Sequence, residues 1–452
     1  MSRSGLTSYP SGSLRELSYL SLPLILSIFS SYLCLFCDRL FLSYYAVQAM
    51  EACTIASSLI LVFQKFSMHI ALMTQPFVAR FKGTGQLSLA GQFTWQMIWF
   101  AIFSSIIIIP LGLFVSSWFF KNCEVQNQAQ IYFNYFLYGN CLFALESVFT
   151  SFYSGIGKTR LIFYVQLISH SLNIGLNVIL IFGIEGWIPS LGVHGAALGT
   201  LFSKLIASLC FWMHFMKKYR NTSYQVENVT FNWKLLREGL SKGMPRALGG
   251  VLVMLNWSLL VYLMTDRGGD YLLALSLGAS LFLPFFSEAI SQGVIGITSY
   301  LIGSQLTHHL GKVVRSALFL NAIGLVIVAI PLLIFPRELL SFFLSYELSS
   351  PTKEILIKVC QWIWFMYLCN SIYFIVLGIT MAYKETFFYL MMNVLGMFFW
   401  TYVPVYCALQ IFGAGPDVFW LVVAFQPLFP AVVLCLMLFR KHWRKKNNLV
   451  VP

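Results

Sequence analysis

The sequence predicts an all-α integral membrane protein whose twelve transmembrane helices form two pseudo-symmetric six-helix lobes. Three observations predict this fold: the composition, a series of long apolar stretches, and motifs that recur on both sides of one long polar stretch. Hydrophobic residues make up 58% of the 452 positions and charged residues only 10%, whereas a soluble domain carries about 25% charged residues. The composition therefore excludes an ordinary soluble globular protein.

The apolar stretches are each roughly 20 residues or longer, which is about the length that crosses the hydrocarbon core of a bilayer. They are too long and too continuous for the strands of a membrane barrel, and lipid requires a backbone whose hydrogen bonds are satisfied internally. We expect spans at residues 14–46, 52–79, 93–118, 129–155, 161–184, 194–216, 247–265, 272–302, 313–335, 355–381, 387–412 and 418–439.

The two halves of the chain resemble each other at several points. TQPFVARFKG (74–83) aligns with TSYLIGSQLT (298–307) at an offset of 224, and SGIGKTRLIFY (154–164) aligns loosely with TMAYKETFFYL (380–390) at 226. Pro23 in the first span corresponds to Pro245 at the head of the seventh. A repeated six-span unit is typical of secondary transporters and predicts a twofold axis along the membrane normal, with the working site between the halves.

This repeat sets the expected domain boundaries. We predict a first lobe at 1–216, a cytoplasmic linker at 217–244, a second lobe at 245–440 and a basic cytoplasmic tail at 441–452.

The distribution of basic residues predicts the topology. With both termini in the cytoplasm, 21 of the 29 Lys and Arg residues lie on the cytoplasmic side and five lie outside. The remaining three, Arg39, Lys65 and Lys204, fall within spans. This asymmetry follows the positive-inside rule, so we expect a multi-pass protein of the plasma (inner) membrane.

The net charge of +13 is explained by basic loops that face anionic lipid, so we expect the bilayer and not nucleic acid as the partner. The ten Cys are scattered without CxxC or CxxH spacing, and neither a metal site nor a disulfide framework is indicated. We find no phosphate-binding loop, HExxH motif or clustered catalytic His and Cys. We therefore expect a monomeric protein that is not an enzyme and needs no cofactor.

The segment 154–203 carries the clearest resemblance to a known family. It contains SGIGKTR, then LNIGLNVILIFG, then IPSLGVHGAALGTLFS; the first two spans add LPLILS, Asp38 about fifteen residues later, and TQPFVARFKGTG. At these residues the chain resembles the multidrug and toxic compound extrusion (MATE) family. The resemblance covers essentially the whole chain and implies two six-helix lobes around a central cavity. It also implies export of amphipathic, cationic small organic compounds in exchange for protons or sodium.

Asp38 is the strongest candidate for the coupling site, because it lies deep in the first span and matches the acidic position that the family uses for coupling. A charge at this depth costs roughly 3 kcal/mol on insertion scales and is retained for a reason. The alternative is simple pairing with a nearby cation, for which adjacent Arg39 is poorly placed, since consecutive helix positions point about 100° apart.

Asn173 and Asn177 match paired polar positions of the family and lie one helical turn apart, and Thr200 is a weaker member of the same group. The two amides are expected to hydrogen-bond Asp38 or to supply oxygens to a sodium ion. Ordinary hydrogen bonding between helices explains the two Asn equally well. Some family members carry an acid where Asn177 stands, which weakens a two-acid mechanism here.

In the second half, Glu288 is the only acid deep within a span, and Asn256 is the only strongly polar residue in VLVMLNWSLL (251–260), where many relatives carry an acid. We expect Glu288 and Lys65 to face each other and to form an inter-lobe pair in one access state. Separate snorkelling charges are the alternative. Glu146 is expected to make a local polar contact, and the sequence indicates no specific role for Lys204.

Two functions remain open. The first is the drug and cation antiporter, and the second is a flippase for lipid-linked oligosaccharide or polysaccharide from the same broader superfamily. Few deep cations favour the antiporter, although Arg39, Lys65 and Lys204 keep the flippase open. A channel and a major-facilitator transporter are disfavoured, because no filter repeat is visible and the loop after the second span lacks the acidic–basic signature of that superfamily.

Overall fold

The computed structural model describes residues 5–121, 125–282, 284–343 and 349–447. Every named element of regular structure in these ranges is a helix, which confirms the all-α prediction. Ten helices are long and apolar enough to cross a membrane, and the bent pair α10 and α11 makes an eleventh. The predicted span at 129–155 consists of two shorter helices, α5 and α6, that meet at Gly139.

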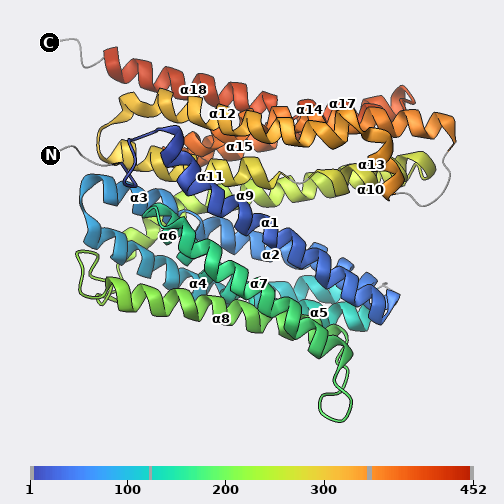
Figure 1. Cartoon of the computed structure of the whole chain (residues 1–452), viewed down its shortest axis with the longest axis horizontal. Helices are drawn as coiled ribbons and strands as arrows, with labels where there is room; N and C mark the ends of the chain where they lie inside the picture. Colours follow the sequence, from blue (N-terminus) through green and yellow to red (C-terminus); the bar gives the residue numbers. More distant parts are fainter. Residues whose placement is uncertain (1–4, 122–124, 283, 344–348, 448–452) are drawn as a thin grey trace.

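The first lobe (Figure 1, blue to green) contains α1 (Leu14–Tyr45), α2 (Val47–Ala71), α3 (Thr74–Thr84), α4 (Leu87–Phe119), α5 (Gln126–Tyr138), α6 (Asn140–Gly155), α7 (Thr159–Phe182) and α8 (Val193–Tyr219). The second lobe (yellow to red) contains α9 (Trp233–Thr265), α10 (Gly269–Leu281), α11 (Phe285–Gly303), α12 (Leu310–Ala329), α13 (Pro336–Phe343), α14 (Ser350–Ala382), α15 (Thr386–Met397), α16 (Val403–Tyr406), α17 (Pro416–Phe425) and α18 (Leu428–Asn447). One short 3₁₀ turn (Thr307–His309) and three π-helical segments (Ile330–Ile334, Phe398–Tyr402 and Cys407–Ile411) complete the lobe.

The apolar composition of these helices shows on their outer faces. Ile106 and Ile107 on α4 keep 68% and 72% of their surface exposed, and Val326 on α12 keeps 66%. Exposed aliphatic side chains on a continuous helix are unfavourable in water and favourable in lipid. The exposed faces of both lobes therefore suit a bilayer, in agreement with the expected multi-pass membrane protein.

Both halves break their second long helix. In the first lobe, α2 ends at Ala71 and α3 begins at Thr74. In the second lobe, α10 and α11 are bent by 44° at a break that precedes Phe285. The two breaks do not correspond under the repeat offset of 224, which takes residues 72–73 to 296–297, inside α11.

The loop between the lobes is shorter than the expected linker of 217–244, because α8 continues to Tyr219 and α9 begins at Trp233. The Asn232 side chain accepts hydrogen bonds from the first free N–H groups of α9, as is typical of an N-cap. The loop is fixed to α4, where Trp95 Nε1 donates to the carbonyl oxygen of Val226 at 2.6 Å. The basic residues of the expected tail continue α18 to Asn447, and residues 448–452 lie outside the described part of the chain.

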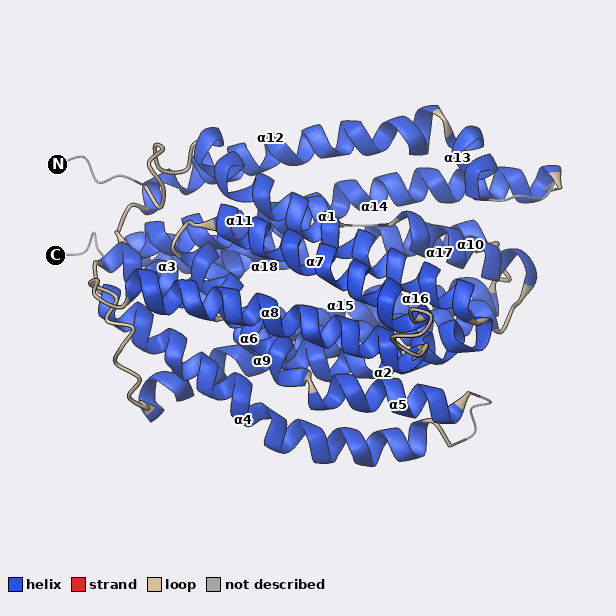
Figure 2. Cartoon of the chain, turned by 60° about the horizontal axis from the view of Figure 1, so that its bottom comes forward, coloured by secondary structure: helices blue, strands red, loops and turns tan. Residues whose placement is uncertain are grey.

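The lobes pack closely at the end of the molecule where both termini lie, and they splay apart toward the opposite end (Figure 1). The close contacts join α3 and α1 to α11, and α2 to α9. Gly83 on α3 and Gly303 on α11 lie against each other there, with no room for a Cβ on either residue. Figure 2 shows both termini at this same end, as an even number of crossings requires.

Side chains also cross the interface between the lobes at this end. Gln75 Nε2 on α3 donates to the carbonyl oxygen of Gln292 on α11 at 2.7 Å. Lys384, in the turn after α14, places its Nζ 3.1 Å from the ring centroid of Phe77 on α3. Both contacts join the two lobes at this end.

The N-terminal segment before α1 is tied to both lobes. The buried Glu16 carboxylate accepts the Gly12 N–H at 2.7 Å and holds the segment as a tight loop. Lys82 Nζ in the first lobe donates to the carbonyl oxygen of Leu6 at 2.9 Å. Ser316 Oγ in the second lobe donates to the carbonyl oxygen of Gly12 at 3.1 Å. The segment therefore bridges the lobes at their closed end.

Candidate functional site

The first lobe places a carboxylate among three polar side chains from two other helices. Asp38 lies in α1, Asn173 and Asn177 lie one turn apart in α7, and Thr200 lies in α8. Asn177 Nδ2 donates to Asp38 Oδ1 at 2.6 Å, and both Asn side chains are almost fully buried. The structure thus brings together all four residues that the sequence singled out as a coupling group.

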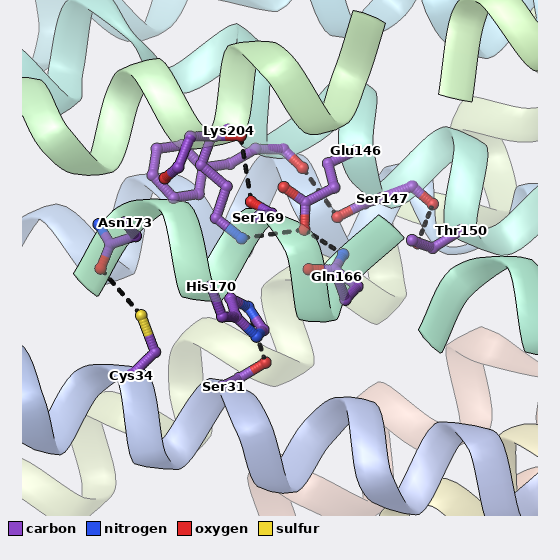
Figure 3. Close-up of polar contacts among 12 residues, drawn as sticks. Ser31, Cys34, Glu146, Ser147, Thr150, Gln166, Ser169, His170, Asn173 and Lys204 are labelled. Carbon is purple, nitrogen blue, oxygen red and sulfur yellow. Dashed lines mark hydrogen bonds and ion pairs between the residues drawn. The ribbon is translucent and has the colours of Figure 1, made fainter. Parts of the chain in front are cut away.

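Asn173 links the carboxylate to the hydroxyl of Thr200. With its amide nitrogen turned toward α1, it donates to Asp38 Oδ1 at 2.9 Å and its oxygen accepts from Thr200 Oγ1 at 3.0 Å. With its amide oxygen turned toward α1, it accepts instead from Cys34 Sγ at 2.9 Å, and Figure 3 shows this arrangement. Only in the first orientation does Asn173 add a second donor to that of Asn177, since an ionised carboxylate can only accept hydrogen bonds.

Asn177 contributes a side-chain amide oxygen to this group. Its Oδ1 is buried without a hydrogen-bond partner and lies against Gly199 in α8, where a Cβ would collide with it. A glycine at this position lets α8 approach α7 closely enough for the amide to fit. The site therefore holds one unused acceptor oxygen beside Asp38.

Arg39 takes no part in this group. Its guanidinium donates to Thr54 Oγ1 at 3.1 Å and to Ser57 Oγ at 2.7 Å, both on α2. The direction follows from the separation of about 100° between consecutive helix positions. Asp38 is consequently left without an ion-pair partner among the described residues.

A second polar group lies one helical turn from Thr200 along α8 (Figure 3). Lys204 Nζ is 3.0 Å from Glu146 Oε1 on α6. The same oxygen accepts Gln166 Nε2 on α7 at 2.6 Å. Only 17% of the lysine side chain and 12% of the glutamate side chain are exposed, so this is a largely buried ion pair.

The sequence analysis did not pair Glu146 with Lys204; it expected a local contact for the first and assigned nothing to the second. The available signal was that two opposite charges occupy the fourth and sixth predicted spans of the same lobe, where unpaired charges are costly. Between this pair and α1 lies His170, whose Nδ1 is 2.9 Å from Ser30 Oγ. The polar interior of the first lobe thus runs from Glu146 past His170 toward Asp38.

The second lobe separates the two residues that the sequence proposed for it. Asn256 lines an internal pocket of about 490 Å³, whereas Glu288 lines a cavity of about 150 Å³ at the lobe interface, together with His69 and Arg246. No described carboxylate lines the larger pocket. A second-lobe site that unites Glu288 with Asn256 is therefore not formed.

Lys65 and Glu288 also do not form the expected ion pair in this structure, in which no contact within 4 Å joins them. His69, one turn after Lys65 on α2, lines the same cavity as Glu288. Lys65 and His69 are separated by one helical turn, about 5.4 Å along the helix axis. The repeat offset alone is not accurate enough to distinguish two positions at this separation. Their pairing in another access state stays a prediction.

No group of three or more His, Cys, Asp or Glu side chains in the described part of the chain is arranged to hold a metal ion. The oxygens around Asp38 are instead one carboxylate, two amides and one hydroxyl. This set of oxygens suits a proton or a weakly held hard cation such as sodium, which binds oxygen ligands as calcium and magnesium do.

Known proteins resemble this chain in sequence and in fold. The MatE family model matches residues 23–179, which include Asp38, Asn173 and Asn177. A probable multidrug resistance protein NorM of Thermotoga maritima is 24% identical over 335 residues, 71% of this chain and 70% of that protein. The multidrug export protein MepA of Staphylococcus haemolyticus is 30% identical over 220 residues, 46% of this chain and 47% of that protein.

Solved structures share the fold over nearly the whole chain. A MATE transporter in its straight conformation superimposes with a TM-score of 0.85 at 16% identity, covering 97% of this chain and 98% of that one. A MOP superfamily transporter from Pyrococcus furiosus gives 0.83 at 16% identity and covers 95% of both chains. The family model, the relatives and the shared fold lead to one conclusion: this chain resembles the MATE family of membrane transporters in sequence and has the fold of those transporters.

Proposed function

We propose that this protein is a secondary active efflux transporter. It exports amphipathic organic compounds, cations among them, in exchange for protons or sodium. The observation that carries the proposal is the position of Asp38, a carboxylate inside a membrane span that has two amide partners and no cationic partner among the described residues. Relatives named as multidrug resistance or export proteins support the choice of substrate.

Asp38 carries the coupling ion in this proposal, and Asn173 responds to its charge. When Asp38 is ionised, Asn173 turns its amide nitrogen toward the carboxylate. When Asp38 is protonated, the acid can donate, and the amide oxygen becomes the favoured partner. A sodium ion would instead take oxygens from Asp38, Asn177 and Thr200, where the unused Asn177 Oδ1 is available.

The arrangement of the lobes supports alternating access. The end that carries the termini is closed by α3 and α1 on α11 and by α2 on α9, and the opposite end is splayed (Figure 1). With the termini in the cytoplasm, as the basic residues predict, the splayed end faces outward. Export then requires the closed contacts to open inward, admit substrate, and close again.

The test is efflux of ethidium from cells that express the full-length protein, under a proton gradient and a sodium gradient imposed separately. We expect one gradient to drive efflux, and Asp38→Asn to abolish that dependence at equal expression. Glu51→Gln, which removes an exposed carboxylate from the same lobe, is the control and should behave as wild type. Gradient-driven efflux that persists in Asp38→Asn would overturn the proposal.

A further inference from the structure

The internal pocket of the second lobe has the dimensions and lining of a small-molecule site. Its volume of about 490 Å³ falls within the range of about 300–1,000 Å³ that is typical of ligand pockets. Helices α9, α10, α14, α15 and α17 all contribute to its wall. The pocket therefore lies inside the second lobe, away from the Asp38 group.

The pocket is lined by aromatic rings and side-chain amides. Trp257, Tyr373 and Trp420 are among the rings, and the Trp420 ring is fixed because its Nε1 donates to the carbonyl oxygen of Ala274 at 3.0 Å. Four amides face the same space, and none of the described lining residues carries a charge; the amides belong to Asn256, Asn370, Asn393 and Gln426.

One of these amides is buried with an unused donor. Asn393 is 6% exposed, and its Nδ2 makes no hydrogen bond. Asn370 Nδ2 donates to the carbonyl oxygen of Met366 in its own helix, so its side-chain oxygen is the group left to accept. A buried donor without a partner costs roughly 1–3 kcal/mol, and a ligand acceptor placed opposite Asn393 would recover that energy.

The internal repeat explains why the pocket lacks charge. The repeat offsets of 222 to 226 take Asp38 to residues 260–264, LVYLM, and Leu260 among them lines the pocket. The second lobe thus carries no carboxylate in the segment that corresponds to Asp38. The nearest charged groups, Glu288 and Arg246, are of opposite sign and line the neighbouring cavity, which shares Phe374, Leu377 and Tyr389 with the pocket.

We propose that this pocket binds an uncharged, planar aromatic group that carries both a hydrogen-bond donor and an acceptor. Aromatic walls stack on a flat ring, and the amides supply donors and acceptors for its polar edge. No described lining residue is an anion that would pair with a cation, so a cation is attracted there only by the ring faces, whereas the amides reward an uncharged polar edge. If the protein exports organic compounds as proposed above, this pocket selects the neutral part of the substrate and admits neutral substrates.

The experiment compares two ligands of the same shape on the purified full-length protein in lipid nanodiscs, by isothermal titration calorimetry. One ligand is the uncharged 1-naphthaleneacetamide, and the other is the cationic (1-naphthylmethyl)trimethylammonium. We expect the amide to bind at least about tenfold more tightly, which corresponds to about 1.4 kcal/mol. Equal or tighter binding of the ammonium, or no binding of the amide, overturns the proposal.

Two variants locate the binding in the pocket. Asn393→Leu should weaken the amide about tenfold, the loss expected for one neutral hydrogen bond. Asn256→Asp places a carboxylate in the pocket and should therefore make the ammonium bind more tightly than the amide. A misfolded protein would not gain affinity for the ammonium. Asn221→Leu, in the exposed loop between α8 and α9, is the control and should bind as wild type.

Amide binding that is unchanged in Asn393→Leu, together with an unchanged preference in Asn256→Asp, contradicts the proposal. The titration uses no ion gradient. A failure of Asp38 coupling would therefore leave this result intact, and the two proposals are tested separately.

Discussion

Asn177 Nδ2 donates to Asp38 Oδ1 at 2.6 Å, and this bond joins α7 to α1 at the polar centre of the first lobe. The amide is fully buried and pressed against Gly199 on α8. Three helices are therefore held in register around one carboxylate. A substitution of Asn177 or Gly199 should therefore alter the hydrogen bonding of Asp38.

Gly199→Ala tests this packing. The new Cβ would collide with Asn177 Oδ1, so the amide must move and its bond to Asp38 weakens. We expect ion-coupled efflux to fall about tenfold, the effect of about 1.4 kcal/mol, with little loss of expression. Gly175→Ala on α7, where a Cβ meets no atom within 4 Å, is the control. Equal efflux in both variants would show that the position of Asn177 does not matter.

The Glu146–Lys204 pair should stabilise the first lobe only as a pair. Removing one partner leaves the other charge largely buried and unpaired. For a fully buried pair this typically lowers the free energy of unfolding by about 3–5 kcal/mol. We expect a smaller loss here, because both side chains keep some exposure. Lys204→Met and Glu146→Gln should each lower the melting temperature, and the double variant should recover part of the loss. Additive losses in the double variant would contradict a direct interaction.

Closure of the end that carries the termini depends on Gly83 and Gly303. A Cβ on Gly303 would collide with the carbonyl oxygen of Arg80 on α3, so Gly303→Ala should push α3 and α11 apart. We expect faster hydrogen–deuterium exchange in both helices than in wild type. Gly311→Ala on α12, a position with open space around it, should leave exchange unchanged. Equal exchange in all three proteins would mean that the interface tolerates an added methyl group.

The contact of Lys384 with Phe77 should depend on pH. Burial lowers the pKa of Lys384 to about 7, more than the nearby Glu238 on α9 raises it, and Arg80 on α3 and Lys242 on α9 lower it further. An exposed lysine has a pKa near 10.5, so between these values the closed state binds fewer protons than an open state. Raising the pH from 7 to 9 therefore favours closure.

The measurement for this prediction is the exchange rate of α3 at pH 7 and pH 9, corrected for the intrinsic effect of pH on exchange. Wild type should become more protected at pH 9, and Lys384→Met should show no such gain. A gain of equal size in Lys384→Met would place the pH dependence elsewhere.

The sequence predicted the Asp38 group well because helical spacing puts Asn173 and Asn177 on one face, and the family motif supplied the partner helices. It did not predict the Glu146–Lys204 ion pair, since the rotation of α6 against α8 depends on packing between helices. The Lys65–Glu288 pair was expected from the repeat offset alone, which cannot resolve one helical turn. The pocket around Asn256 was equally hard to predict, because its amides come from three helices and from the turn after α17.

The most direct measurement of ion coupling is the release of the coupling ion when substrate binds. Ethidium is added to the purified full-length protein in weakly buffered solution, and proton release is followed with a pH indicator and sodium release with a sodium electrode. We expect wild type and Glu51→Gln to release one kind of ion, and Asp38→Asn to release neither. Release of the same ion in the same amount from Asp38→Asn would contradict the assignment of coupling to Asp38.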